Sequence, residues 1–396
     1  MDSQRHRVAF DGLFLQQPTT GSGQYALHLW RRLAAGDASL EAVLLRPAPA
    51  PGDGTPANGA ATVAPPPWAR AGKSHKLWWE QRGVVRAAHR ASADLLHVPY
   101  FAGPRSARLP LVITIHDVIP LVFPEYGGSL PMRLYLRLVI GAARRARMIL
   151  TDSDCSARDI QGWLEIPSDR IQVIPLAADP SFRPVDDPEA SAALRERYDL
   201  RGPVVFNVDG LDVRKNLAAL VEAFARALPE LPPDTRLVIA GRAHTGNRRL
   251  YPPLETSIRA WGLQDQVVLA GRVGDAEKLA LYNLADLYVS ASLYEGFGLS
   301  PLEAMACGTP VVSSNRASLP EVVGSGGLLV DPTPARLAAA IVSVTTDEWL
   351  RRDLGRRALA RAGAFSWERT ADATRDVYRH VIRDAHAGHG RRQPAR

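Results

Sequence analysis

The chain has 396 residues, a formal net charge of +7 and 46% hydrophobic residues. This length predicts two domains, since single domains commonly hold about 100–200 residues. The composition excludes a disordered or collagen-like chain, and two cysteines are too few for a disulfide scaffold. The basic residues are unevenly divided, because only four of the 48 are lysines: Lys73, Lys76, Lys215 and Lys278.

Neither cysteine belongs to a pattern that indicates metal or redox chemistry, because Cys155 and Cys307 lie far apart and away from any Cys/His pair. The N-terminus lacks the apolar segment of a signal peptide, and no run approaches the ~18–20 apolar residues of a membrane span. We therefore expect a cytoplasmic protein that holds no metal and no other cofactor.

Short apolar runs alternate with helical patterns along the chain. Strands buried on both faces have this appearance, and intervening helices at Leu217–Leu228, Ala276–Leu284 and Ala335–Thr345 supply the crossovers. The pattern predicts an α/β chain of two doubly wound, Rossmann-like domains. The predicted strands are Val8–Asp11, Glu41–Leu45, Asp94–Val98, Leu111–Ile115, Met148–Thr151, Ile171–Ile174, Val204–Val208, Arg236–Ala240, Val267–Ala270, Leu287–Ser290 and Val311–Ser313.

A polar, proline-containing segment, Asp179–Gly202, separates the two series of strands. We place the domains at 1–185 and 186–365, followed by a helix over 366–384 that returns to the first domain and a flexible tail at 385–396. Pro47–Pro67 is of low complexity and has few large apolar side chains, so we expect a mobile loop there.

The most informative stretch runs from Glu295 to Glu303 and reads EGFGLSPLE. One interpretation is structural: Ser300 and Glu303 form a capping box, with Pro301 at the first helical position. That interpretation leaves Glu295 and the Gly-Phe-Gly turn unexplained. In the functional interpretation, the turn and helix N-terminus bind a diphosphate, and the two glutamates bind hydroxyls of a nucleotide sugar.

This stretch resembles the E-x7-E motif of the family-4 glycosyltransferases, which are retaining enzymes of the GT-B fold. The resemblance extends through Arg214-Lys215-Asn216 and through the segments 267–273, 285–292, 307–312 and 319–330. In the first half it is looser, at Gly21-Ser-Gly23 and Ile115-His-Asp117. It implies two domains that face each other across a cleft containing the active site.

The resemblance also implies roles for residues of the motif. The second domain would bind the nucleotide sugar, with Glu303 on the ribose and Glu295 on hydroxyls of the transferred sugar. The backbone of Phe297, Gly298, Leu299 and Ser300 would lie near the phosphates and sugar. The anomeric configuration would be retained without a protein nucleophile, through an oxocarbenium-like state in which the leaving phosphate helps to take the acceptor proton.

Arg214 and Lys215 follow a predicted strand and precede a helix, which places them at the carboxyl edge of the sheet. Two cations there can neutralise a diphosphate leaving group in place of a metal. The alternative is an ordinary basic loop with Asn216 as helix N-cap. Family members commonly carry an arginine five residues before the lysine, where this chain has Gly210, so the assignment of Arg214 as its replacement stays open.

Three further groups acquire roles from the resemblance. His116 would face the transferred sugar; a structural hydrogen bond is the alternative. Gly21 and Gly23 would form a glycine loop over the donor phosphates. Their G-x-G-x-x-A pattern lies too far from the preceding strand for a dinucleotide fingerprint, which disfavours an NAD-dependent dehydrogenase. Val273 and Lys278 would lie near the nucleobase, with Asp275 either beside them or at a solvated helix start.

Asp152-Ser-Asp154 matches a D-x-D triplet, which signals metal-bound nucleotide sugar in another glycosyltransferase fold. Here a turn and helix start is the favoured interpretation. The Arg133–Arg147 region interleaves arginine with leucine and indicates either contact with an anionic membrane or an amphipathic helix with a basic outer face. Nucleic-acid binding is disfavoured because the charge is scattered.

We therefore predict a metal-independent retaining hexosyltransferase that uses a nucleotide diphosphate sugar. GDP-mannose is suggested as donor by similar enzymes, and the acceptor would be a glycan, a lipid-linked glycan or a small molecule. The segment Lys76–Gln81 is the candidate for the acceptor side. The alternatives are a GT-B epimerase acting on a sugar nucleotide and a binding protein without turnover.

Overall fold

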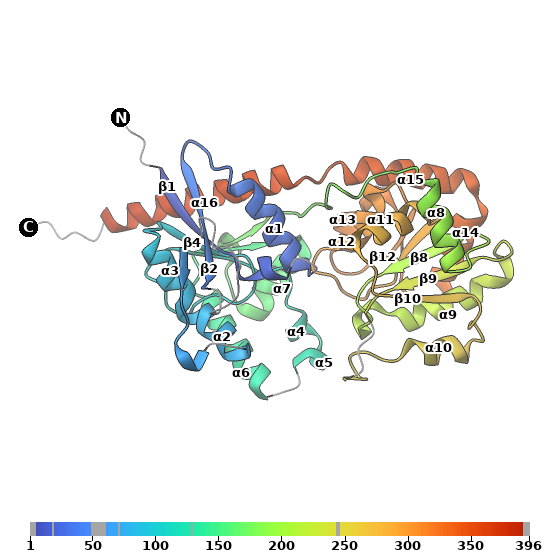
Figure 1. The fold of residues 1–396 in the computed structure, drawn as a ribbon, viewed down its shortest axis with the longest axis horizontal. Helices are drawn as coiled ribbons and strands as arrows, with labels where there is room; N and C mark the ends of the chain where they lie inside the picture. The colour runs from blue at the N-terminus through green and yellow to red at the C-terminus, as the bar shows by residue number, and fades with distance from the viewer. Residues whose placement is uncertain are drawn as a thin grey trace, which may run out of the picture. The chain divides into compact units, whose positions relative to one another are not determined.

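The computed structural model describes residues 5–17, 20–48, 61–69, 72–127, 130–242 and 246–390. The chain forms two compact units (Figure 1). Unit 1 comprises Met1–Leu176 and Trp367–Arg396, and unit 2 comprises Ala177–Ser366. Each unit is an α/β structure built on one parallel sheet, which confirms the predicted fold class.

The sheet of unit 1 has seven strands in the order β3-β2-β1-β4-β5-β6-β7, and every neighbouring pair is parallel. The four residues of β4, β5 and β6 are buried throughout, as expected for strands covered by helices on both faces. The strands are β1 (His6–Asp11), β2 (Leu40–Pro47), β3 (Ala61–Val63), β4 (Leu95–Val98), β5 (Leu111–Thr114), β6 (Met148–Thr151) and β7 (Ile171–Val173).

Strand β3 lies within the segment predicted to be a mobile loop. Ala61–Val63 pairs with Leu45–Pro47 of β2 and forms the edge of the sheet, so the loop prediction is wrong at this end. The short run Ala-Thr-Val has too few apolar residues to stand out from its surroundings. Residues 49–60 of the predicted loop lie outside the described residues.

The helices of unit 1 pack against both faces of its sheet, and a core that includes Trp79, Leu96, Ile113 and Ile160 fills the interior. A π-helical turn, Trp79–Gly83, joins α2 to α3. The helices are α1 (Gly21–Leu33), α2 (Gly72–Trp78), α3 (Val84–Arg90), α4 (Ile119–Val122), α5 (Pro124–Gly127), α6 (Leu130–Ala143), α7 (Asp154–Leu164) and α16 (Trp367–Gly390).

The sheet of unit 2 has six parallel strands in the order β10-β9-β8-β11-β12-β13. The chain runs outward from β8 through β9 to β10 and then returns to β11 on the other side of β8. Ligands bind at such a switch point in doubly wound sheets. The strands are β8 (Val204–Val208), β9 (Arg236–Ala240), β10 (Val267–Gly271), β11 (Leu287–Ser290), β12 (Val311–Ser314) and β13 (Leu328–Val330).

Helices also cover both faces of this second sheet. Helices α9 and α10 lie on one face and α11, α12 and α13 on the other (Figure 1), while α14 packs against α9. Leu220, Phe224, Val289 and Ile341 are among the core residues. The helices are α8 (Pro188–Arg197), α9 (Leu217–Ala227), α10 (Leu254–Ala260), α11 (Asp275–Leu284), α12 (Leu299–Ala306), α13 (Leu319–Val323), α14 (Pro334–Thr346) and α15 (Glu348–Ala362).

The division between the units falls earlier than the predicted boundary at 185/186. The reason is local packing, because the ring of Phe182 lies 5.7 Å from that of Tyr282 in unit 2. The backbone N–H of Val185 also donates to Asn283 Oδ1 at 2.8 Å. At the other end, α16 continues through Gly390, beyond the predicted end at 384, and 391–396 lie outside the described residues.

Among the described residues, none of the helices combines the length and apolar character needed to span a membrane.

The parallel sheets bring loops from different parts of the chain to the same edge. Because all strands of a sheet are parallel, the loops that follow β5 and β6 meet at one edge of unit 1, and those that follow β8 and β11 meet at one edge of unit 2. The predicted residues His116, Arg214, Lys215 and Glu295 fall on these loops, whereas Gly21 and Gly23 open α1, and Val273 and Lys278 follow β10.

Candidate active site

The loop after β8 carries the two predicted cations. Asp212 begins a 3₁₀ turn, η5 (Val213–Lys215), by accepting a hydrogen bond from the backbone N–H of Arg214 at 3.2 Å. Asn216 follows with a left-handed φ of 55°, and its side chain donates to the carbonyl of Pro332 at 3.1 Å. Asn216 thus occupies the N-cap position of α9, as the alternative interpretation expects, but its side chain makes no capping hydrogen bond.

Lys215, Arg214 and Glu295 form a compact ionic cluster at the carboxyl edge of β8 and β11. Lys215 Nζ donates to Glu295 Oε1 at 2.6 Å and also binds Asp209. Arg214 Nη1 donates to Glu295 Oε2 at 2.6 Å and to the carbonyl of Tyr294 at 2.8 Å. The side chains of Lys215 and Glu295 are only 8% and 12% exposed, so this cluster is largely removed from water.

Burial and charge act in opposite directions on the two carboxylates that contact Lys215, those of Glu295 and Asp209. Burial alone would raise the pKa of Glu295, but the adjacent Lys215 and Arg214 cations lower it to about 2. Burial raises the pKa of Asp209, and the neighbouring Glu295 carboxylate adds to that rise against the opposing effect of Lys215. Glu295 is thus an ionised hydrogen-bond acceptor at neutral pH and cannot act as a general acid.

The Gly-Phe-Gly turn is held by contacts within the unit. Gly298 has a φ of 115°, and a Cβ at this position would lie 2.9 Å from Leu319 Cδ2. Ser318 Oγ contacts the carbonyl oxygens of Glu295 at 2.9 Å and of Phe297 at 2.7 Å. The ring of Phe297 packs edge-on against Phe365, with centroids 5.9 Å apart. The turn therefore has a fixed conformation that a non-glycine residue at 298 would strain.

Helix α12 does not begin with the capping box that the sequence permits. It starts at Leu299 behind Gly298, with no side chain capping it. Ser300 Oγ donates instead to Asp209 Oδ1 at 3.2 Å, and the Glu303 side chain turns toward α11. The structural interpretation of Ser300 and Glu303 is therefore wrong, and both side chains belong to the polar network at the sheet edge.

Glu303 is the centre of a second buried pair. Its Oε1 accepts from Lys278 Nζ at 3.0 Å and its Oε2 from the Tyr282 hydroxyl at 3.0 Å. Burial raises the pKa of Glu303, partly offset by Lys278, and also raises the pKa of Tyr282 well above its usual range. The Lys278 ammonium lies over the ring of Phe182, 4.6 Å from its centroid. Glu303 is held in one orientation by two donors.

In unit 1, His116 follows β5 and lies beside the loop after β6. Its Nδ1 is 2.7 Å from Asp152 Oδ2, and the ring of Tyr25 packs edge-on against it at 4.8 Å. Burial alone would lower the pKa of His116, but the Asp152 carboxylate raises it overall. The imidazole therefore has a charged partner and a fixed ring orientation.

The Asp152-Ser-Asp154 triplet is divided between two structural tasks. Asp152 is 3% exposed and binds His116, whereas Ser153 caps α7 by accepting from the Ser156 backbone N–H at 3.0 Å. Asp154 is the first residue of α7. The predicted turn and helix start are confirmed.

Gly21 and Gly23 open α1, and Thr20 caps that helix through the Gly23 N–H at 3.1 Å. The two glycines differ in what surrounds them. A Cβ on Gly23 would lie 1.9 Å from the Gln17 carbonyl oxygen, whereas one on Gly21 would meet nothing within 4 Å. Gly23 is thus required by the turn of its own chain, and only Gly21 leaves open space.

Two family models cover most of the chain: glycosyltransferase family 4 matches residues 19–182, and glycosyl transferases group 1 matches residues 194–361. The O-antigen chain mannosyltransferase B of Escherichia coli is 33% identical over 293 residues, which are 72% of this chain and 74% of that protein. The chain is a family-4 glycosyltransferase.

Other relatives extend this assignment. The serotype-specific mannosyltransferase WbdA of Escherichia coli is 32% identical over 279 residues, or 69% of this chain. That match spans about a third of WbdA, 34% of its length. Sucrose-phosphate synthase from Thermosynechococcus elongatus superposes with a TM-score of 0.73 at 24% identity, covering 96% of this chain and all of the other. Anabaena HepE, solved with UDP-glucose, gives 0.71 at 20% identity, covering 94% and 99%. The glycosyltransferase has their GT-B fold.

Within unit 2 of the glycosyltransferase, most predicted donor residues come together. Arg214, Lys215, Glu295 and Ser300 form one network, and Lys278 and Glu303 form a neighbouring pair. Phe297, Gly298 and Leu299 form the turn and helix start between them. Val273 is half-buried in the turn between β10 and α11. The structure gives it no specific contact.

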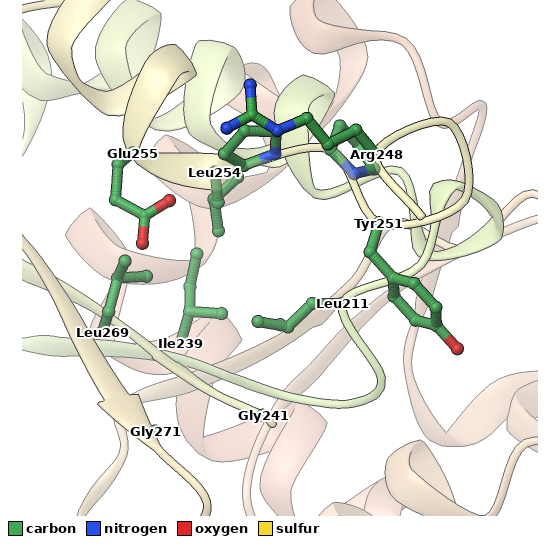
Figure 2. Close-up of a pocket in the computed structure, with 11 residues that line it drawn as sticks. Leu211, Ile239, Gly241, Arg248, Tyr251, Leu254, Glu255, Leu269 and Gly271 are labelled. Atoms are coloured by element: carbon green, nitrogen blue, oxygen red, sulfur yellow. The ribbon is translucent and has the colours of Figure 1, made fainter. Parts of the chain in front are cut away.

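A separate hollow of about 390 Å³ opens at the carboxyl edge of β9 and β10. Figure 2 shows its largely apolar lining, in which Leu211, Ile239, Leu254 and Leu269 surround the space and Glu255 points toward Leu269. None of the residues predicted to bind the donor lines this hollow. Its lining also includes the polar side chains of Arg248, Tyr251 and Glu255.

Two residues of the network escaped the sequence analysis of the glycosyltransferase. Asp209 follows β8 directly, and an acidic residue at the carboxyl end of a buried strand was an available signal. Tyr282 lies four residues after Lys278, which puts both on one face of α11. Its hydroxyl could have been expected beside Glu303 only once α11 and α12 were known to be adjacent.

The predicted acceptor segment of the glycosyltransferase is more buried than expected. Trp79 and Glu80 have no exposed surface, and Trp79 Nε1 donates to Asp11 Oδ1 at 2.9 Å. Burial raises the pKa of Glu80 to about 7, against the opposing effect of Lys76 3.6 Å away. In this segment, direct contact with an acceptor would have to come from the more exposed Lys76, Leu77 and Gln81.

Proposed function

We propose that this glycosyltransferase moves a hexose from a nucleotide diphosphate sugar to a hydroxyl of a glycan, lipid-linked or small-molecule acceptor, with retention of configuration. The observation that carries the proposal is the buried Lys215–Glu295 contact beside the Lys278–Glu303 pair. Mannose from GDP-mannose is the proposed donor because two of the relatives described above are mannosyltransferases.

In this proposal the two glutamates bind opposite ends of the donor. Glu303 accepts hydrogen bonds from the ribose hydroxyls, and Val273 and Lys278 lie near the base. Glu295 accepts hydrogen bonds from the transferred sugar, which suits a carboxylate whose pKa is lowered to about 2. The backbone from Phe297 to Ser300 binds phosphate and sugar at the start of α12.

Arg214 and Lys215 stabilise the departing diphosphate. Their charges are already oriented by carboxylates, so little reorganisation is required when negative charge develops on the leaving group. This supply of fixed positive charge supports the proposal that no metal is needed. Arg214 takes the place of the family arginine missing at Gly210, which its contact with Glu295 supports.

In unit 1, Gly21 contributes open backbone for the donor phosphates, with Gly23 shaping the same turn. We assign His116 to the transferred sugar, with Asp152 holding the imidazole ring. The acceptor proton leaves with the help of the departing phosphate. No protein nucleophile takes part, because Glu295 is engaged by two cations.

Peripheral binding to an anionic membrane belongs to the same proposal, as a way to reach a lipid-linked acceptor. Leu130 and Leu134 are 68% and 55% exposed and lie one turn apart on α6, and Arg133 and Arg137 are also exposed. Exposed leucines flanked by arginines suit the surface of an anionic bilayer. Reversing the charge of Arg133 and Arg137 would abolish flotation with phosphatidylglycerol vesicles; unchanged flotation would remove this part of the proposal.

The test of the main proposal has two stages. Thermal-shift screening of UDP-, GDP- and dTDP-sugars identifies the donor, and the protein is then incubated with that donor and candidate acceptors in EDTA. We expect a transferred, α-linked product and free nucleoside diphosphate. An isomerised sugar nucleotide without transfer would indicate an epimerase, and binding without turnover would indicate a binding protein. Loss of activity in EDTA that a divalent metal restores would contradict metal independence.

A further inference from the structure

Three potential metal ligands meet in unit 1, away from the residues assigned to the donor. One atom each of His6, Asp94 and His386 lies within 4.8 Å of the other two. His6 is the first residue of β1, Asp94 immediately precedes β4, and His386 lies on α16. The three ligands therefore come from segments that are far apart in the sequence.

The fold brings the first two together for structural reasons. Strands β1 and β4 are adjacent and parallel, and the backbone N–H of Asp94 donates to the carbonyl of Arg7 at 2.8 Å. Asp94 Oδ2 in turn accepts from the Arg7 N–H at 2.8 Å. These bonds fix the Asp94 carboxylate beside His6 before any ion binds.

The third ligand is supplied by the docking of α16. Arg379 Nη2 donates to Asp37 Oδ2 at 2.6 Å, and Tyr378 is buried against the sheet, so the helix is held along unit 1. His386 follows two turns later, and its ring packs edge-on against that of His6, with centroids 5.5 Å apart. His386 is more exposed than His6 and Asp94, so its side chain has room to adjust.

The separation of His6 and Asp94 fits two ligands of one cation as well as it fits a direct ion pair. His6 Nδ1 lies 3.6 Å from Asp94 Oδ2, which is too long for a hydrogen bond. Two ligands bound at about 2.1 Å to one tetrahedral zinc ion lie roughly 3.4 Å apart. His6 and Asp94 are therefore already spaced as two ligands of one ion. A small movement of His386 would bring a third ligand to the same ion.

We propose that His6, Asp94 and His386 bind one Zn²⁺ ion, with water in the remaining position. Two neutral imidazoles and one carboxylate form a ligand set that zinc prefers, whereas calcium and magnesium prefer oxygen ligands alone. The ion would join the end of α16 to the amino ends of β1 and β4 in the unit 1 sheet. Its role is structural and is independent of the proposed transfer reaction.

The experiment is calorimetric titration of ZnCl₂ into the full, tag-free chain after treatment with a chelator. We expect one site, with affinity lowered roughly tenfold or more in each of His6→Ala, Asp94→Asn and His386→Ala, because each loses one ligand. His380→Ala is the matched control, since His380 is an exposed histidine of the same helix that lies outside the cluster. Circular dichroism verifies that every variant is folded.

Thermal unfolding supplies a second measurement. Zinc should raise the Tm of the wild type and of His380→Ala, because a ligand bound only to the folded state stabilises it. At the same zinc concentration it should raise the Tm of His386→Ala less, because binding to that variant is weaker. Three results would overturn the proposal: no binding to the wild type, equal affinity in all variants, or weakened binding in His380→Ala. None of these results bears on sugar transfer.

Discussion

Lys215 is a nearly buried ammonium in a chain whose other basic residues are almost all arginines. It contacts both Asp209 and Glu295, and a compact ammonium can do so where a planar guanidinium would need more space. Lys278 is likewise paired with Glu303. Lys73 and Lys76, by contrast, are exposed. Two of the four lysines therefore stand where the proposed donor needs positive charge.

Replacement of Lys215 tests the charge that it supplies. We expect Lys215→Ala to lower kcat about 10²–10³-fold, the usual cost of removing one fixed donor from a developing anion. The control is Lys73→Ala, which removes an exposed lysine of α2. Steady-state kinetics with the donor found by screening measures both variants. Near-normal turnover of Lys215→Ala would contradict the assignment.

Burial opposes the raised pKa of His116, and Asp152 is the main neighbour that raises it, ahead of Asp117 and the backbone of Pro99. Asp152→Asn should lower the pKa of His116, because the carboxylate that raises it is lost. The titration can be followed by NMR of the histidine ring protons. Burial lowers the pKa of His97 to about 3, with a further contribution from His116, so the His97 ring stays neutral over the range in which His116 titrates. An unchanged His116 titration would show that Asp152 does not hold the imidazolium.

The same pair predicts a pH dependence of stability. A raised pKa in the folded state means that the pair stabilises fully at pH values below the unfolded pKa of histidine and loses this contribution as pH rises through the folded pKa. The difference in free energy of unfolding between wild type and Asp152→Asn should therefore shrink from pH 6 to pH 9. Urea unfolding at both values measures it, and a growing difference would contradict the argument.

At the scale of single elements, the turn before α12 is the most constrained. Gly298→Ala should destabilise unit 2 by roughly 1–2 kcal/mol, because its positive φ strains a side chain and the Cβ would approach Leu319. Gly274→Ala is the matched control: Gly274 also precedes a helix, has a φ of −81° and has open space for a Cβ. Equal stability of the two variants in urea would show that the turn tolerates a side chain.

Helix α16 is connected to the unit 1 sheet by a buried chain of hydrogen bonds. The Tyr378 hydroxyl lies 2.6 Å from His97 Nδ1, and His97 Nε2 lies 2.8 Å from Thr114 Oγ1. Tyr378→Phe leaves a buried imidazole nitrogen without its partner, which should lower the free energy of unfolding by about 1–3 kcal/mol. Asp376→Asn, which removes an exposed ion pair on the same helix, should have a smaller effect.

The sequence predicted the long elements well and the short ones poorly. Strands such as Val204–Val208 are continuous apolar runs whose burial on both faces leaves little ambiguity. Ala61–Val63 and Leu328–Val330, two three-residue edge strands, were missed, whereas Ile171–Val173, a third edge strand of that length, was predicted. Edge position is a property of the whole sheet and is not encoded locally.

The candidate site divides in the same way. The motif around Glu295 and Glu303 could be predicted, because its glycines and carboxylates served no evident structural purpose together. The pairing of these carboxylates could not, since the contacts of Glu295 with Lys215 and of Glu303 with Tyr282 join segments that are distant in the sequence. The capping box was predicted from local sequence alone. It does not form, because the Ser300 hydroxyl donates to Asp209 instead.

At the scale of the whole molecule, the chain forms two α/β units, each built on a sheet of parallel strands. Its last helix belongs to the first unit. Each unit presents charged side chains at the carboxyl edge of its sheet: His116 with Asp152 in unit 1, and Lys215 with Glu295 in unit 2. The central claim is that the unit 2 cluster binds and activates a nucleotide diphosphate sugar.

One measurement tests that claim most directly: release of nucleoside diphosphate from the donor found by screening, in EDTA with acceptor present, for wild type and Lys215→Ala. We predict sustained release together with glycosylated acceptor for the wild type, and a loss of about 10²–10³-fold for the variant. Equal release by both proteins, or none by the wild type with any nucleotide sugar, would contradict the account.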